Sequence, residues 1–165
     1  MSRVIAFLVG LAIVGGGIFA VVYKNKGSHP ELKGSILKVR SLADGDGAIV
    51  FLDFRVTNTA AIPFVVNSVQ MTMETLDSEV ANAVMFSKSD VDKVTRYLKL
   101  LGPKYNDVLS IQDKLPPVET VDRMAAGRFN FPPRFLNPRK TFHLRITEAD
   151  GVVSEIVEEA ATPAK

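Results

Sequence analysis

The chain has 165 residues, a formal net charge of +2, 47% hydrophobic residues, and no cysteine or tryptophan. This length predicts one domain, with or without an appendage, and the apolar fraction excludes a wholly disordered chain. The lack of cysteine excludes disulfides and thiolate metal sites, and two histidines are too few for an all-histidine zinc site. We therefore expect neither a metal nor a cofactor.

The apolar character is concentrated near the N-terminus. Residues 4–23 contain no charged side chain, and Arg3, Lys24 and Lys26 flank this run. A helix of that length spans about 30 Å, which matches the hydrocarbon thickness of a bilayer. A cleaved signal peptide would have a shorter apolar core, of about 7–15 residues, and a small-residue cleavage site. The run therefore predicts an uncleaved, single-pass transmembrane helix at 4–23.

The charges around this segment give two indications of membrane orientation. Five cations follow the segment closely, at Lys24, Lys26, Lys33, Lys38 and Arg40. A positive-inside count would keep the large domain in the cytoplasm. A three-residue tail before a long apolar run is instead typical of signal anchors, which export the domain that follows. We expect an extracytoplasmic domain.

Small residues repeat along the predicted anchor helix. Ala12, Gly16 and Ala20 recur every four residues, and such a row allows two membrane helices to approach closely. Small residues are also common in membrane helices that do not pair. Helix–helix contact through Ala12, Gly16 and Ala20 is therefore one of two open interpretations.

A polar linker is expected at 24–31, before the domain, and a disordered tail at 159–165, after it. Within the domain, alternation with a period of two predicts strands. The clearest is 48–57, whose even positions are apolar and whose Asp53 and Arg55 lie on the opposite face. Further strands are expected at 35–42, with Leu37 and Val39 inward, and at 64–76, 118–124 and 128–131.

A helical pattern interrupts the strands at 89–101. Ser89 and Asp92 have the spacing of a capping box, and Gly102 followed by Pro103 is typical of a helix C-terminus. An apolar stripe runs along one face of this predicted helix. The stripe consists of Val91, Val94, Leu98 and Leu101.

The last predicted element is a hairpin of two strands, 141–148 and 152–158. A three-residue loop with glycine in the left-handed conformation fits the residues between them. This register pairs apolar with apolar and basic with acidic side chains across the strands. The pairs are Leu144 with Ile156 and Arg145 with Glu155.

Six or seven short strands with one inserted helix predict an antiparallel, immunoglobulin-like β-sandwich at 32–158. Within it, Val56, Asn58 and Pro63 form the pattern V-x-N-x-x-x-x-P in the segment 52–74. This segment resembles LEA14-like and water-stress (WHy) domains and related bacterial membrane-anchored domains. The resemblance implies a β-sandwich that binds or supports, and not an enzyme.

No catalytic constellation is visible in the sequence. There is no G-x-S-x-G, P-loop or dinucleotide-binding glycine pattern. The acidic turn 44–47 begins like a calcium loop, but Ile49 and Arg55 occupy the positions that require glycine and a carboxylate. No serine or acid is placed to make His143 a general base. We expect no enzymatic activity, and an enzyme of unknown class is the second alternative.

One stretch of the domain, 123–145, contains cations and no acid. Phenylalanines alternate with these cations, as in sites for anionic polymers or lipid headgroups. The other interpretation is ordinary strand alternation, with the cations outward and neutralised by acids of a paired strand. The cations are Arg123, Arg128, Arg134, Arg139, Lys140 and Arg145.

The residues after 23 contain nineteen cations and eighteen acids, so the net charge of the domain is close to zero. We therefore expect no nucleic-acid partner. The sequence therefore predicts a single-pass membrane protein whose β-sandwich is an interaction or structural module for a protein partner. The first alternative is binding of anionic lipid headgroups or an envelope polymer through 123–145.

Overall fold

The structure is a computed structural model that describes residues 15–16, 31–136 and 138–158. Its strands are β1 (Leu32–Asp44), β2 (Gly47–Asn58), β3 (Phe64–Thr75), β4 (Val80–Met85), β5 (Lys114–Leu115), β6 (Glu119–Phe129), β7 (Arg139–Glu148) and β8 (Val153–Val157). Its helices are α2 (Lys88–Tyr97) and two short 3₁₀ turns, η1 (Lys99–Leu101) and η2 (Pro133–Phe135). Strands therefore dominate, as the alternation predicts.

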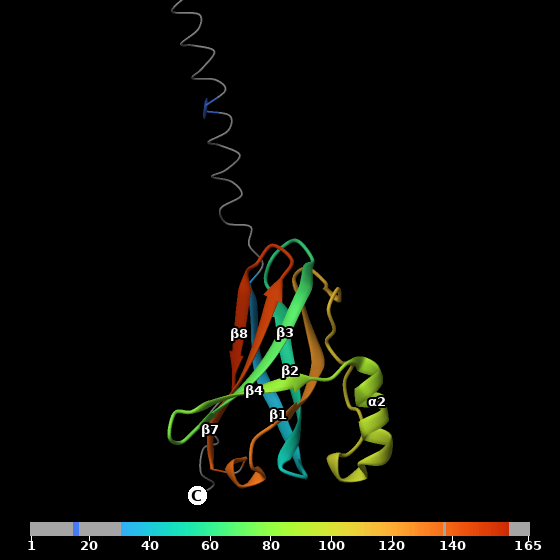
Figure 1. Ribbon diagram of the computed structural model, residues 1–165. Coiled ribbons are helices and arrows are strands. Elements are labelled where there is room, and N and C mark those ends of the chain that lie inside the picture. The colour runs from blue at the N-terminus through green and yellow to red at the C-terminus, as the bar shows by residue number, and fades with distance from the viewer. Residues whose placement is uncertain (1–14, 17–30, 137, 159–165) are drawn as a thin grey trace, which may run out of the picture.

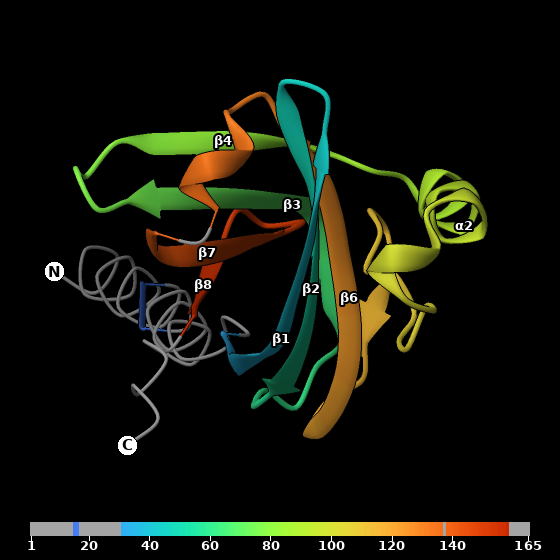
Figure 2. The ribbon, with the colours of Figure 1, turned by 90° about the horizontal axis from the view of Figure 1, so that it is seen from below.

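The strands pair antiparallel in the order β1-β2-β6-β4-β3-β7-β8, with β5 beside β3. β4 belongs to two layers, because its first half pairs with β3 and its second half pairs with β6. One layer contains β1, β2 and β6, and the other contains β3, β7 and β8 (Figures 1 and 2). The predicted mainly-β, antiparallel sandwich with one inserted helix is confirmed.

The two layers close on one another along the side where β1 begins. The backbone N–H of Leu32 donates a buried hydrogen bond of 2.9 Å to Ser154 Oγ on β8. Gly34 makes this approach possible, because a Cβ there would collide with the carbonyl oxygen of Arg55 and meet Ile156 Cδ1 at 3.1 Å. On the opposite side of the sandwich, β4 and the segment 107–113 both connect β3 and β6: β4 pairs with each strand, and the segment bonds the backbone of Met124 and of Val66.

β2 is the centre of the molecule because both of its faces are buried. Val50, Leu52 and Phe54 face the core between the layers, and all three are fully buried. Phe51 faces the other way, into a second apolar cluster with Val91 of α2. Helix α2 therefore lies on the outer side of the β1-β2-β6 layer (Figure 2).

The structure corrects one detail of the first strand. Leu37 was expected to face inward, but it is 50% exposed. A β-bulge between Ile36 and Lys38 shifts the register against β2 at this point. Val39, which follows the bulge, packs against the core as predicted.

The helix starts earlier and ends earlier than the sequence indicates. Ser87 is the N-cap, and it forms the capping box with Asp90; the predicted pair of Ser89 and Asp92 is wrong. The N–H of Phe86 still donates to the carbonyl of Ala126, so the strand pairing runs to the residue before the cap. α2 ends at Tyr97, and η1 continues the apolar stripe to Leu101.

Two strands differ from the sequence pattern. β4 was not predicted, and the two expected strands at 118–124 and 128–131 are one strand, β6. Ala125 and Ala126 have low strand propensity, but both are buried, and pairing with β2 overrides that propensity. The hairpin register is confirmed, with Leu144 opposite Ile156 and a left-handed Gly151.

Of the predicted anchor 4–23, the structure describes only Gly15 and Gly16, which are helical and exposed. Ala12 and Ala20 lie outside the described residues, as do the linker up to residue 30 and the tail 159–165. Among the helices that are described, none has the length and apolarity that a membrane crossing requires.

Candidate functional site

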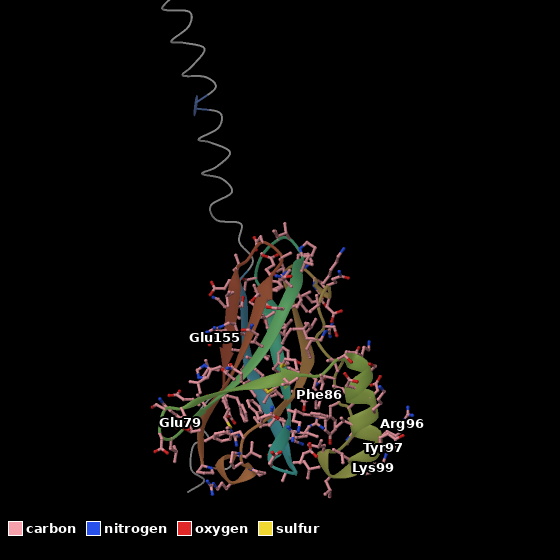
Figure 3. The ribbon with its side chains drawn as sticks, viewed as in Figure 1. Glu79, Phe86, Arg96, Tyr97, Lys99 and Glu155 are labelled. Carbon is pink, nitrogen blue, oxygen red and sulfur yellow. The ribbon has the colours of Figure 1, made fainter. Side chains whose placement is uncertain are left out.

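A cleft of about 520 Å³ opens where β4 leaves β3 and crosses to β6. Three segments line it: 68–70 of β3, 85–88 at the junction of β4 and α2, and 109–111 of the loop before β5. Phe86 lies at this junction, between β4 and α2 (Figure 3). The cleft therefore lies on the side of the sandwich where β4 and the segment 107–113 pass between the layers.

The edge of β3 beside the cleft has no strand partner over five residues. β5 pairs with Phe64 and Val65, and β4 pairs with β3 only from Thr72 onward. The loop before β5 makes two backbone hydrogen bonds with Val66: the N–H of Gln112 donates to the carbonyl of Val66, and the N–H of Val66 donates to the carbonyl of Asp113. Within the described residues, nothing pairs as a strand with 67–71 on this edge, and β7 occupies only the other edge.

Gly127 explains why β4 separates from β3. Residues 83–85 of β4 pair with 127–129 of β6 instead of continuing along β3. A Cβ at Gly127 would lie 2.9 Å from the carbonyl oxygen of Val84, a distance that real side chains do not adopt. Glycine thus allows β4 to approach β6, and this approach exposes the edge of β3.

The cleft is mainly apolar, with a few polar groups at its rim. Leu109 is buried at its base, Met85 and Phe86 are half-buried, and Ile111 is exposed. Ser68, Gln70, Ser87, Lys88 and Ser110 provide hydroxyl, amide and ammonium groups. No histidine or carboxylate is among the described residues that line it. Such a surface is suited to binding, and it holds no pair of groups for acid–base chemistry.

A second, smaller cavity of about 190 Å³ lies on the outer face of β2, where Asp53, Tyr105 and Asn106 line it. Asp53 Oδ2 accepts hydrogen bonds from Arg40 Nε at 3.0 Å and Nη2 at 2.8 Å. Asp53 Oδ1 accepts from Asn106 Nδ2 at 3.1 Å. Arg40 Nη1 also donates to the carbonyl of Leu101 at 2.7 Å. The hydrogen bonds of these groups are made to one another. They connect β2 to η1, so the role that the geometry supports for this cavity is structural.

The six cations of 123–145 do not form one patch. Arg123 and Arg128 lie on β6, Arg134 lies in η2, and the other three lie on β7 in the opposite layer. Four of them form ion pairs with carboxylates at 2.6–3.4 Å: Arg128 with Asp44 and Asp46, Arg139 with Glu158, Lys140 with Glu74, and Arg145 with Glu155. Anionic-ligand binding through this stretch stays a prediction.

His143 lies between two carboxylates on the outer face of the second layer. Its Nδ1 is 3.4 Å from Glu155 Oε1, and its Nε2 is 3.8 Å from Glu74 Oε2. A hydrogen bond from Lys140 lowers the pKa of Glu74. None of the three residues lines the cleft. Across the described residues, no cluster of three or more histidines and carboxylates could hold a metal ion.

No protein-family profile matches the chain, and no curated protein matches it. A Bordetella pertussis protein assigned as ApaA is 15% identical, with 79% of this chain and 89% of that chain covered and a TM-score of 0.39. A Northeast Structural Genomics Consortium target is 10% identical, with 85% and 91% covered and a TM-score of 0.36. An uncharacterized β-sandwich protein from Clostridium difficile 630 is 11% identical, with 79% and 82% covered and a TM-score of 0.35.

These likenesses are too low to carry a functional argument. None of the three names refers to the LEA14-like or water-stress domains that the segment 52–74 resembles. Membership of that family therefore stays a prediction. The functional proposal has to rest on the geometry of this chain.

Proposed function

We propose that this protein is a membrane-tethered β-sandwich that binds an extended segment of a partner protein in the cleft beside β3. The uncharged segment 4–23 is the tether, and the unpaired edge 67–71 is the binding strand. The observation that carries the proposal is that an open strand edge and an apolar cleft occur at the same place.

The dimensions and chemistry of the edge fit a short extended peptide. Five residues of strand span about 16 Å, which is enough to pair with three or four residues of a partner. The backbone N–H and C=O groups of the edge would supply affinity, and the apolar cleft would receive alternate side chains of the peptide. Natural proteins usually block open edges with charged side chains or a bulge. Lys88 is the one cation among the described residues that line this cleft.

A small apolar ligand is the competing occupant, because about 300–1,000 Å³ is the ordinary size of a small-molecule site. The strand edge favours a peptide, since a small apolar molecule would leave the backbone groups of 67–71 unused. The proposal places the side chains of 109–111 along one wall of the bound peptide.

The cleft is tested with the full chain in lipid nanodiscs, screened against a displayed library of seven-residue peptides. Ile111, 65% exposed at the rim, is changed by Ile111→Asp, which should weaken the selected peptides about tenfold or more by placing a charge against an apolar contact. Val153→Asp is the matched control, because Val153 is 49% exposed on β8 and lies outside the cleft. Equal affinity for the two variants would contradict the assignment.

The tether is tested separately by alkaline extraction of cell membranes that contain the full chain. The native chain should stay with the membrane pellet, and the double substitution Leu8→Arg with Leu11→Arg should release it, because each charge opposes insertion by about 2.5–3.5 kcal/mol. A native chain found in the supernatant would contradict tethering and leave the cleft assignment intact. A topology reporter fused at the C-terminus tests the expected extracytoplasmic side.

A further inference from the structure

The end of α2 and the following turn η1 present two large apolar side chains to solvent. Tyr97 is 76% exposed and Leu100 is 87% exposed. Val91 and Leu101 of the same segment are buried in the apolar cluster beneath the helix. Their burial fixes the segment so that the opposite face, with Tyr97 and Leu100, points to solvent. We name Arg96, Tyr97, Lys99 and Leu100 the helix tip. Adjacent exposed apolar side chains of this kind mark interaction sites.

The helix tip is also cationic. Residues 93–104 contain four cations and no acid. Lys93 pairs with Asp90 at 3.7 Å, and Lys104 pairs with Asp92 at 3.6 Å. The side chains of Arg96 and Lys99, in contrast, have no ion-pair or hydrogen-bond partner among the residues that the structure describes. Figure 3 shows Arg96, Tyr97 and Lys99 together at one corner of the molecule.

This corner lies far from the place where the described domain begins. Arg40 Nη1 bonds the carbonyl of Leu101, and Arg40 is eight residues along β1 from Leu32. Eight residues of strand span about 26 Å. The tip therefore projects from the end of the sandwich opposite to the start of β1 (Figure 1).

We infer that the helix tip binds the surface of an anionic lipid bilayer. Tyrosine and leucine insert readily at the level of the headgroups, and arginine and lysine bind anionic headgroups while their aliphatic stems remain in apolar surroundings. A projecting tip with free cations fits a deformable anionic surface; a folded acidic protein would need a matching hollow. The helix tip shares no residue with the cleft, so this inference goes beyond the proposed peptide binding.

The absence of tryptophan from the native chain provides a direct probe. The full chain carrying Tyr97→Trp, held in nanodiscs of neutral lipid, is mixed with vesicles of phosphatidylcholine alone or with added phosphatidylserine. We expect the emission to move to shorter wavelength, with quenching by brominated lipids, only with the anionic vesicles. Val80→Trp is the matched control, because Val80 is 64% exposed and follows Glu79 on the opposite side of the molecule (Figure 3).

Adding Arg96→Gln and Lys99→Gln to the Tyr97→Trp chain should raise the lipid concentration for half-maximal shift about tenfold or more, with the thermal midpoint of unfolding unchanged. The inference is overturned if anionic vesicles produce no shift or if neutral vesicles produce an equal one. A shift with polyglutamate and none with vesicles would also overturn it and would assign the tip to an acidic protein partner.

Discussion

At the scale of single residues, the pair of Arg40 and Asp53 joins three parts of the chain. The two side chains are only 9% and 5% exposed, and they connect β1, β2 and the carbonyl of Leu101 in η1. The guanidinium of Arg40 also lies 5.3 Å from the ring centre of Phe51 and 4.8 Å from that of Tyr105. Through the bond to Leu101, this buried pair positions η1 against the sheet. Compared with an apolar pair of similar size, it contributes little net free energy of folding.

Removing one partner of this pair should therefore be costly. Arg40→Ala should lower the free energy of unfolding by about 3–5 kcal/mol, because it leaves the carboxylate of Asp53 buried without its cation. Urea denaturation of the full chain in nanodiscs, followed by tyrosine fluorescence, measures this change. The double variant Arg40→Met with Asp53→Leu is the control and should recover most of the loss. A single variant as stable as the native chain would contradict the role of the pair.

Acid sensitivity is expected from carboxylates whose pKa values are lowered in the folded chain. Hydrogen bonds from Arg55 lower the pKa of Asp122, and hydrogen bonds from Ser87 lower the pKa of Asp90. Since the folded chain binds these protons less readily than the unfolded chain, acid favours unfolding. The stability that they contribute is present above the ordinary pKa of 3.8 and is lost as the pH falls through the lowered values.

The free energy of unfolding should accordingly decrease when the pH falls below about 5. Urea titrations at a series of pH values measure the slope. Asp122→Asn should make the slope shallower, because it removes one of the groups that take up a proton on unfolding. Asp77→Asn is the control at an exposed acid. An identical slope for Asp122→Asn and the native chain would contradict the assignment of the bond between Arg55 and Asp122.

At the scale of elements, two serines lie at the start of α2, and only one of them, Ser87, is the N-cap. Ser87 accepts from the N–H of Asp90, and the carboxylate of Asp90 accepts from the N–H of Ser87. Ser87→Ala should lower the free energy of unfolding by about 1 kcal/mol, whereas Ser89→Ala, inside the first turn, should have a smaller effect. Chemical denaturation of the two variants decides between them. A larger loss for Ser89→Ala would support the capping box expected from the sequence.

Elements determined by neighbouring residues could be predicted from the sequence, and elements determined by distant ones could not. The hairpin of β7 and β8 was predicted with its register, because its turn and its cross-strand pairs lie within 18 residues of one another. β4 has no comparable local signal. Its two halves are placed by β3 and by β6, which is more than 30 residues further along the chain. Gly127 becomes informative only when the carbonyl of Val84 is beside it.

The same distinction applies to the candidate sites. The cleft has no signal in the sequence, because segments near residues 69, 86 and 110 meet only in the folded chain. The cationic stretch 123–145 is conspicuous, and two of its acidic partners, Glu155 and Glu158, belong to the paired strand or follow it, as one interpretation expected. The partner of Lys140 could not be foreseen, because Glu74 is 66 residues away. The helix tip has a simpler signal, an acid-free run at 93–104 that contains four cations.

At the scale of the whole molecule, the two sides of the sandwich differ: β1 meets β8 on one side, and part of the β3 edge is unpaired on the other. The bond between Leu32 and Ser154 joins the layers at the first side, and β4 and the segment 107–113 connect β3 and β6 at the second. We expect the amides of 67–71 that point away from β7 to exchange with solvent faster than those of β2, whose two edges are both paired. Hydrogen exchange measured by NMR on the full chain tests this, and uniform protection along β3 would contradict the open edge.

The most direct test of the account is whether a peptide in the cleft binds through its backbone. A seven-residue peptide selected on the full chain is resynthesised with N-methyl groups on its odd residues or on its even residues. Pairing with the edge of β3 predicts that one methylation pattern abolishes binding and that the other leaves it nearly unchanged, because alternate amides of a strand face its partner. Equal tolerance of both patterns would contradict strand addition, and with it the central claim.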